Sequence, residues 1–144
     1  MNPLYLFAVV LAIVLVTVAD AKIFDTCSLA KALADQGIKK ADLPNWVCLI
    51  QSESSMDTSK KHLNTNGSTD WGLYQINDKF WCQPPGSNAK RDCNVKCTDL
   101  LTDDISKATT CAKLIYSRQG FAAWYGWRSK CQGKKLPDLS KCKI

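Results

Sequence analysis

Residues 45–82 read NWVCLIQSESSMDTSKKHLNTNGSTDWGLYQINDKFWC, and they decide the fold of this chain. The first part has apolar residues at helical spacing, and from residue 58 the pattern changes to Asn, Thr, Gly and Ser with short alternating apolar positions. The pair Asn66-Gly67 is typical of a tight hairpin turn. We therefore expect a helix that leads into a small antiparallel sheet.

Two carboxylates in this stretch, Glu53 and Asp70, have contrasting surroundings. Glu53 ends the apolar helical run, where loss of solvent and the negative end of the helix would both raise its pKa. Asp70 lies among hydrogen-bond donors and should stay ionised. One neutral carboxylic acid beside one carboxylate is the pair that cleaves glycosidic bonds. Taken singly, a solvated Glu at a helix end and an Asp that binds local amides are the more common interpretations.

The same stretch resembles the c-type lysozymes. The matching pieces are NWVC, an E-S pair, N-x-x-GSTD, G-x-x-QIN and a final W-C, in the order and spacing of that family. The resemblance implies an α+β fold with a cleft between a helical lobe, about residues 22–57 and 102–144, and a β lobe, about residues 58–101. It also implies Glu53 as general acid and Asp70 as nucleophile or charge stabiliser, roles established for lysozyme.

The first residues are typical of a secretion signal. An apolar run covers residues 4–18 and is followed by small residues, so we expect cleavage after Ala21 and one domain over residues 22–144. A membrane anchor is the alternative, but 15 apolar residues are fewer than the roughly 20 that a spanning helix needs.

All eight cysteines follow the expected cleavage site, which indicates a secreted, extracellular protein with four disulfides. Spacing alone leaves roughly 105 pairings open. The resemblance implies Cys27 with Cys142, Cys48 with Cys131, Cys82 with Cys97, and Cys93 with Cys111. A zinc site lacks the usual ligand pattern, because there is no C-x-x-C pair and only one histidine.

The formal net charge of +6 is spread along the chain. A positive surface favours polyanions such as bacterial walls, although nucleic acid would be attracted by the same non-specific force. We expect no specific nucleic-acid partner, no stable membrane insertion and a monomer.

The remaining pattern predicts three more helices and one loop. Helical spacing covers residues 26–36, and the second helix is expected to start at Asp42 as N-cap. A third is expected from Thr102, with Ile105, Ala108, Ala112 and Ile115 on one face and an end at Gly120. A fourth is expected over residues 121–129. Residues 82–97 are expected to form a loop held by disulfides.

Amides and aromatic rings are the groups that bind sugars. Seven residues combine these properties and match cleft positions of the family, and they are Asn64, Gln75, Asn77, Phe80, Trp81, Ala123 and Trp124. Core packing is the alternative for the two tryptophans. The chain departs from the family pattern with Phe80 in place of a tryptophan, with Trp71 in place of a tyrosine, and without an acidic residue near Ser117 and Arg118.

No cofactor or metal is expected. Some members of the superfamily bind calcium in an acidic loop, but Lys107 and Ala108 stand here where acids are needed. Asp103 and Asp104 are explained by helix capping. Asn66-Gly67-Ser68 is a formal glycosylation sequon, for which the turn is the stronger interpretation.

The resemblance therefore implies a secreted lysozyme that hydrolyses the β-1,4 bond between N-acetylmuramic acid and N-acetylglucosamine in peptidoglycan, or that acts on chitooligosaccharides. The alternatives are a non-catalytic binding protein like the lactalbumins and a cationic antimicrobial that damages membranes.

Overall fold

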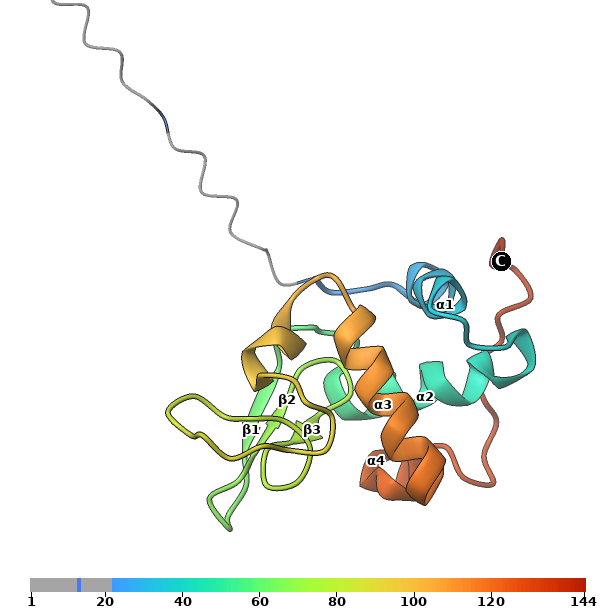
Figure 1. The fold of residues 1–144 in the computed structure, drawn as a ribbon. Coiled ribbons are helices and arrows are strands. Elements are labelled where there is room, and N and C mark those ends of the chain that lie inside the picture. The colour runs from blue at the N-terminus through green and yellow to red at the C-terminus, as the bar shows by residue number, and fades with distance from the viewer. Residues whose placement is uncertain (1–12, 14–21) are drawn as a thin grey trace, which may run out of the picture.

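The computed structural model describes residue 13 and residues 22–144. The expected signal peptide, residues 1–21, lies outside the described residues except for Ile13. Within the described part the chain forms a group of helices and a small sheet lobe beside them (Figure 1).

The first two helices form as the pattern predicts, with one correction. Helix α1 spans Thr26–Asp35, and its N-cap Asp25 accepts the amide of Ser28 at 2.8 Å. Helix α2 spans Leu43–Ser54 after a 3-10 turn, η1, at Lys40–Asp42. Asp42 is the N-cap of α2, but its side chain makes no capping hydrogen bond, because Asp42 is itself in the preceding turn.

Three short antiparallel strands form the sheet in the order β1-β2-β3. They span Lys61–Leu63, Thr69–Trp71 and Ile76–Asn77. The expected turn joins β1 to β2, and Gly67 adopts a φ of 85° there, which favours glycine. The register places Asp70 between His62 on one side and Asn77 on the other.

The third helix begins later than expected. Helix α3 spans Ser106–Gln119, and a separate 3-10 turn, η2, occupies Cys97–Leu101. Thr102 has an extended backbone and its hydroxyl donates to the carbonyl of Asp104 at 2.9 Å, so it does not cap α3. The side chain of Asp104 instead accepts the amide of Ser106 at 2.9 Å.

The fourth predicted helix is divided in two. A 3-10 turn, η3, covers Phe121–Ala123, and α4 covers only Tyr125–Lys130. Trp124 stands between them with an extended backbone and is 5% exposed, so its ring anchors the junction in the core. The end of α3 at Gly120 is as predicted.

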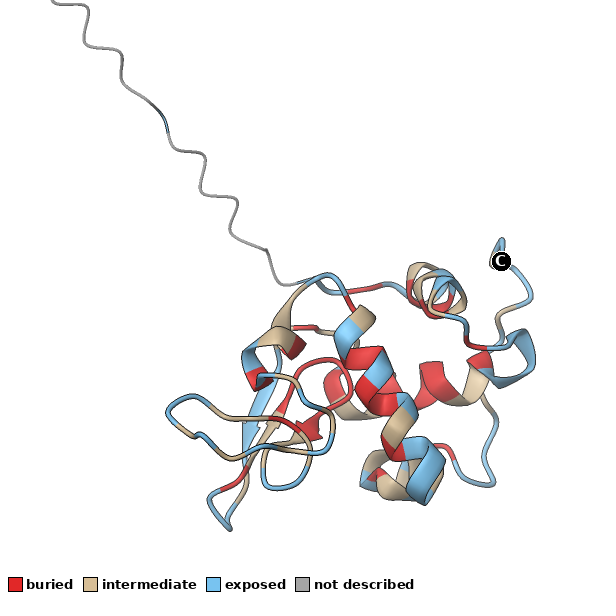
Figure 2. Cartoon of the chain, viewed as in Figure 1, coloured by how far each residue is buried: buried red, intermediate tan, exposed pale blue. Residues whose placement is uncertain are grey.

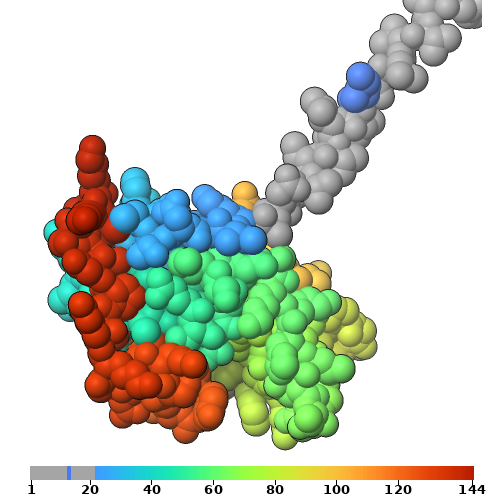
Figure 3. All heavy atoms as spheres, turned by 180° about the vertical axis from the view of Figure 1, so that it is seen from behind, coloured from blue at the N-terminus to red at the C-terminus, as the bar shows by residue number. Residues whose placement is uncertain are grey.

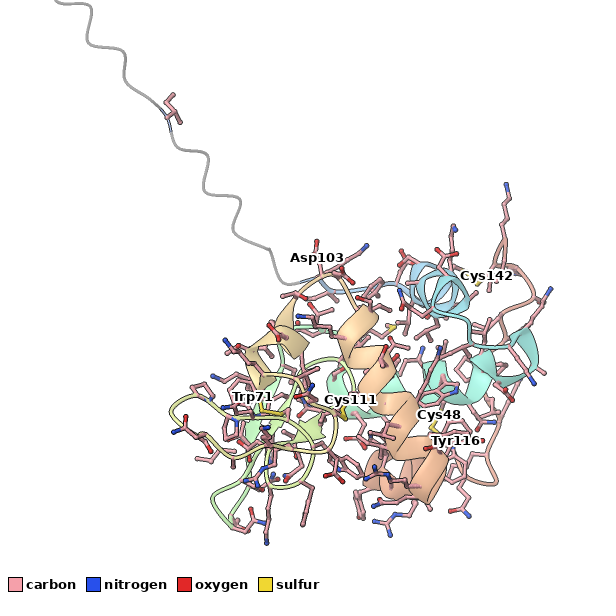
Figure 4. All side chains as sticks on the ribbon, in the orientation of Figure 1. Cys48, Trp71, Asp103, Cys111, Tyr116 and Cys142 are labelled. Atoms are coloured by element: carbon pink, nitrogen blue, oxygen red, sulfur yellow. A yellow bond between two sulfur atoms is a disulfide. The ribbon has the colours of Figure 1, made fainter. Side chains whose placement is uncertain are left out.

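The core is one cluster of buried side chains from α1, α2 and α3 and from residues 71–76 of the sheet lobe (Figure 2). The predicted apolar face of α3 is buried there, and it consists of Ile105, Ala108, Ala112 and Ile115. The four disulfides join Cys27 to Cys142, Cys48 to Cys131, Cys82 to Cys97 and Cys93 to Cys111, the pairs that the resemblance implies. Figure 4 places Cys142 beside α1 and Cys111 where α3 meets the β lobe.

The predicted α+β fold, with a helical lobe, a small sheet lobe and four disulfides, is thus confirmed. Viewed from behind, a notch separates the orange surface of α4 from the green surface of the sheet lobe (Figure 3). The candidate site lies between these two parts.

Candidate functional site

Both carboxylates line one cavity of about 210 Å³ between the lobes. The lining consists of Glu53, Asp70, Gln75, Ile76, Asn77, Trp81, Ile115, Gln119, Ala123, Trp124 and Tyr125. A larger hollow of about 630 Å³ lies beside Cys48 and Pro137, but no carboxylate lines it. Acid and base chemistry therefore belongs to the smaller cavity.

Glu53 lies in the last turn of α2 and reaches the cavity between elements that are distant in the sequence. The backbone N–H of Gly126 donates to its Oε1 at 2.8 Å. Burial raises the pKa of Glu53 above its ordinary value, the Gly126 N–H opposes that rise, and the charge of Asp70 adds to it. The nearby Lys60 charge acts to lower the same pKa. The net effect holds the carboxyl protonated to higher pH than usual.

Asp70 lies in the middle of β2 and is held by two side-chain amides. The Nδ2 of Asn77 donates to its Oδ1 at 2.8 Å, and the Nδ2 of Asn64 donates to its Oδ2 at 3.1 Å. Both amides also donate to the hydroxyl oxygen of Ser68, at 2.9 and 3.2 Å. These contacts fix the direction of the carboxylate.

The seven residues predicted to bind sugar separate into three groups. Five line the cavity, and they are Gln75, Asn77, Trp81, Ala123 and Trp124. Asn64 does not line it but binds Asp70, and Phe80 lies outside the lining with 58% of its surface exposed. The Nε2 of Gln75 already donates to the carbonyls of Gly72 and Lys60, at 2.9 and 3.0 Å.

Trp124 belongs to both the core and the cavity. It is 5% exposed, and its Nε1 donates to the carbonyl of Tyr74 at 2.9 Å. Its ring packs edge to face against Trp46, with centroids 5.8 Å apart. Trp124 therefore packs in the core and also gives the cavity an apolar wall, and its role in binding sugar stays a prediction.

Besides the lining residues Ile76, Ile115 and Gln119, sequence reasoning missed two residues of the site, Tyr125 and Gly126. Tyr125 lines the cavity and is 73% exposed, and the guanidinium carbon of Arg128 lies 5.5 Å from its ring centroid. The adjacent aromatic pair Trp124-Tyr125 is a sequence signal that could have identified Tyr125. Gly126 acts through its backbone, and nothing in the local sequence pattern points to such a role.

Residues 22–144 contain no group of three or more His, Cys, Asp and Glu side chains arranged to hold a metal ion. None of the helices in this described range is long and apolar enough to cross a membrane.

Comparisons with known proteins show which family the chain resembles. The family model described as C-type lysozyme/alpha-lactalbumin family matches residues 22–142. The chain is 57% identical to Lysozyme c-1 of Anopheles gambiae over 126 residues, which cover 87% of this chain and 88% of that protein. It is 53% identical to a lysozyme of Bombyx mori over 142 residues, which cover 99% of this chain and 100% of that protein.

A solved structure is also similar. The crystal structure of recombinant wild-type canine milk lysozyme, apo-type, superimposes with a TM-score of 0.76 and 36% identity. The match covers 85% of this chain and 100% of the canine chain.

Proposed function

Since the chain belongs to the C-type lysozyme/alpha-lactalbumin family and is a glycoside hydrolase, we propose that it hydrolyses the β-1,4 bond between N-acetylmuramic acid and N-acetylglucosamine in bacterial peptidoglycan. Chitooligosaccharides are the expected second substrate, because they share the ring and the bond. No cofactor enters the reaction. The protein is proposed to act as a secreted monomer outside the cell, in antibacterial defence or in digestion.

One observation carries the proposal. Glu53, whose pKa is raised by burial, lines the same cavity as Asp70, whose carboxylate accepts two amide hydrogen bonds. A proton donor and an anion that share one cavity are the two groups that a glycosidase requires on either side of the scissile bond.

The reaction follows from these environments. Glu53 donates its proton to the glycosidic oxygen, and the bond from that oxygen to the anomeric carbon breaks. Asp70 donates an electron pair to the anomeric carbon on the opposite face and forms a glycosyl ester. Glu53, now ionised, then removes a proton from water, and that water displaces Asp70. Two inversions give net retention of configuration.

The test compares wild type with Glu53→Gln, which keeps the shape of the side chain but removes its proton donor. Suspended cell walls are followed by turbidity and by new reducing ends. We expect wild type to clear the walls and release reducing ends, and we expect the variant to lose at least about a hundredfold of that rate. Equal clearing by both proteins, without reducing ends, would favour the membrane-damaging alternative. Binding without hydrolysis by wild type would favour the lactalbumin-like alternative.

Retention is tested on a soluble chitooligosaccharide by proton NMR in the first minutes of hydrolysis. The β-anomer should appear first and then equilibrate with the α-anomer. First appearance of the α-anomer would mean that a water attacks directly and that Asp70 acts as a general base.

A further inference from the structure

Two cations lie over the two aromatic rings at one end of the cleft. The Nζ of Lys79 is 5.4 Å from the ring centroid of Phe80, and the guanidinium carbon of Arg118 is 5.6 Å from that of Trp81. Trp81 lines the cavity, and Phe80 precedes it on the exposed rim. We call these four residues the cationic aromatic end.

Arg118 lies in the last turn of helix α3, which places it at the cationic aromatic end. Cys111 and Arg118 are seven residues apart in α3 and therefore lie on one face of the helix, two turns from each other. Cys111 is bonded to Cys93, and the neighbouring Asp92 forms an ion pair with Arg118. The disulfide and the ion pair thus attach the same loop to the same helix face, which fixes Arg118 beside Trp81.

Three cations gather at this end, Lys79, Arg91 and Arg118. The carboxylate of Asp78 accepts the Thr69 amide at 3.1 Å and the Trp71 Nε1 at 3.2 Å, so each of its oxygens already accepts a hydrogen bond from β2. The Nε of Arg91 donates to the carbonyl of Asp78 at 3.0 Å, which brings a further cation. Lys79, Arg91 and Arg118 therefore lie beside the acidic residues Asp78 and Asp92 at this end, and Glu53 and Asp70 line the same cavity as Trp81.

Arg118 also keeps unused donors. Its Nη1 bonds to Asp92, and a guanidinium has five N–H groups in a fork that fits a carboxylate. Within residues 22–144, no other hydrogen bond or ion pair is recorded for the Arg118 side chain, and none for the Nζ of Lys79. About half of the Arg118 side chain, 48%, is exposed, so a ligand can reach these donors.

We propose that Arg118, with Lys79 beside it, binds a carboxylate on the glycan and so selects acidic, peptide-bearing chains over uncharged ones. A sugar ring packed against Trp81 would place its substituents next to the guanidinium. The carboxylates of the peptide branches on peptidoglycan are the matching chemistry, and a polymer of N-acetylglucosamine has none. This inference rests on the proposed function and names which substrate feature the cleft favours.

The experiment measures kcat/KM on two soluble glycans with the same number of sugars. One is an uncharged N-acetylglucosamine oligomer, and the other is a peptidoglycan fragment whose peptide branches carry carboxylates. The variants are Arg118→Gln and Arg118→Lys. The control is Lys31→Gln, because Lys31 also forms an exposed ion pair with an aspartate, Asp35, at 3.3 Å but lies in α1.

We expect Arg118→Gln to lower the ratio of kcat/KM, charged over uncharged glycan, by about tenfold, the effect of losing one charge-assisted hydrogen bond. Arg118→Lys should give a smaller fall, since it keeps the charge but loses the fork. Lys31→Gln should leave the ratio at the wild-type value. The wild-type ratio should also fall with added salt more steeply than that of Arg118→Gln.

Three outcomes would overturn the proposal. An equal loss on both glycans would mean that Arg118 only supports the position of Trp81. An unchanged ratio would mean that no carboxylate is bound. A loss matched by Lys31→Gln would mean that only the net charge matters. Thermal unfolding of each variant verifies the fold. Failure of the proposed function is distinguished by wild type alone, because it would then cleave neither glycan.

Discussion

At the scale of single residues, four influences act on the pKa of Glu53, the proposed general acid. Burial is the largest and raises the pKa of Glu53, the Gly126 N–H lowers it, the Asp70 charge raises it, and the Lys60 charge lowers it. The first influence can be predicted from the apolar residues that precede Glu53 in α2. The second cannot, because Gly126 is 73 residues away and contributes only a backbone group.

Removal of the Lys60 charge should therefore move the pH profile. The positive charge favours the ionised form of Glu53, so Lys60→Met should raise its pKa further. The general acid must be protonated, and the falling, high-pH side of the kcat/KM profile should consequently shift to higher pH. The shift should be small, since this influence is the weakest of the four. The measurement is kcat/KM for hydrolysis of a chitooligosaccharide between about pH 3 and about pH 9.

Two variants control this result. Lys61→Met removes the neighbouring lysine, which lies over the Trp71 ring at 4.9 Å and does not act on Glu53, so its profile should match wild type. Lys60→Arg keeps the charge, so the high-pH side of its kcat/KM profile should stay at the wild-type position. A shift of the high-pH side to lower pH in Lys60→Met would contradict the predicted rise in the Glu53 pKa.

At the scale of elements, α4 acts on the site through its second residue. A Cβ added to Gly126 would lie 2.7 Å from the Oε1 of Glu53 and 3.1 Å from the Cβ of Ser52. The first contact is with the free end of a flexible side chain. It can be relieved by moving the carboxylate, so the fold should tolerate the change while the catalytic geometry does not.

Gly126→Ala should thus lower kcat by about tenfold, below the roughly hundredfold that a 1 Å misplacement can cost. The midpoint of thermal unfolding should stay close to wild type, because alanine is also the better helix former. Turnover of a soluble chitooligosaccharide and a thermal melt of the same sample test both statements. A large fall in the melting midpoint with an unchanged kcat would show that Gly126 matters for packing only.

Element boundaries show what the sequence pattern could not provide. The buried face of α3 was predictable, since Ile105, Ala108, Ala112 and Ile115 follow the helical period. Its start was not, because Thr102 and Asp104 both have the chemistry of an N-cap. Neither is the N-cap, because Thr102 ends η2, Asp104 binds the Ser106 amide, and Ile105 is the N-cap residue from which α3 starts. A cap residue identifies the vicinity of a helix start, and the neighbouring turn decides the residue.

At the scale of the whole molecule, the site exists only where two lobes meet. Glu53 comes from α2 and Asp70 from β2, so the polar and apolar contrast around them could be predicted while their shared cavity could not be derived from local patterns. The family resemblance supplied the cleft and the cysteine pairs, which no spacing rule selects. Long-range packing and the disulfides bring Glu53 and Asp70 into one cavity, and local sequence patterns do not determine either of them.

Two of these disulfides should differ in their effect on activity. Cys48–Cys131 joins α2, which carries Glu53, to the residue after α4, which carries Gly126. Cys27–Cys142 joins α1 to the C-terminal segment, and neither cysteine lines the cavity that holds Glu53 and Asp70. They close segments of 83 and 115 residues, so the chain-entropy model gives them similar effects on the unfolded state.

Replacement of either pair by alanine should therefore cost about 2 to 5 kcal/mol of unfolding free energy, measured by denaturant titration at a temperature where both variants stay folded. Only the loss of Cys48–Cys131 should also lower kcat, because α2 and α4 then hold Glu53 against the Gly126 N–H less firmly. The double variant at Cys27 and Cys142 is the matched control and should keep the wild-type kcat. Equal losses of kcat in the two variants would mean that catalysis depends on the stability of the whole molecule, rather than on the contact between these two helices.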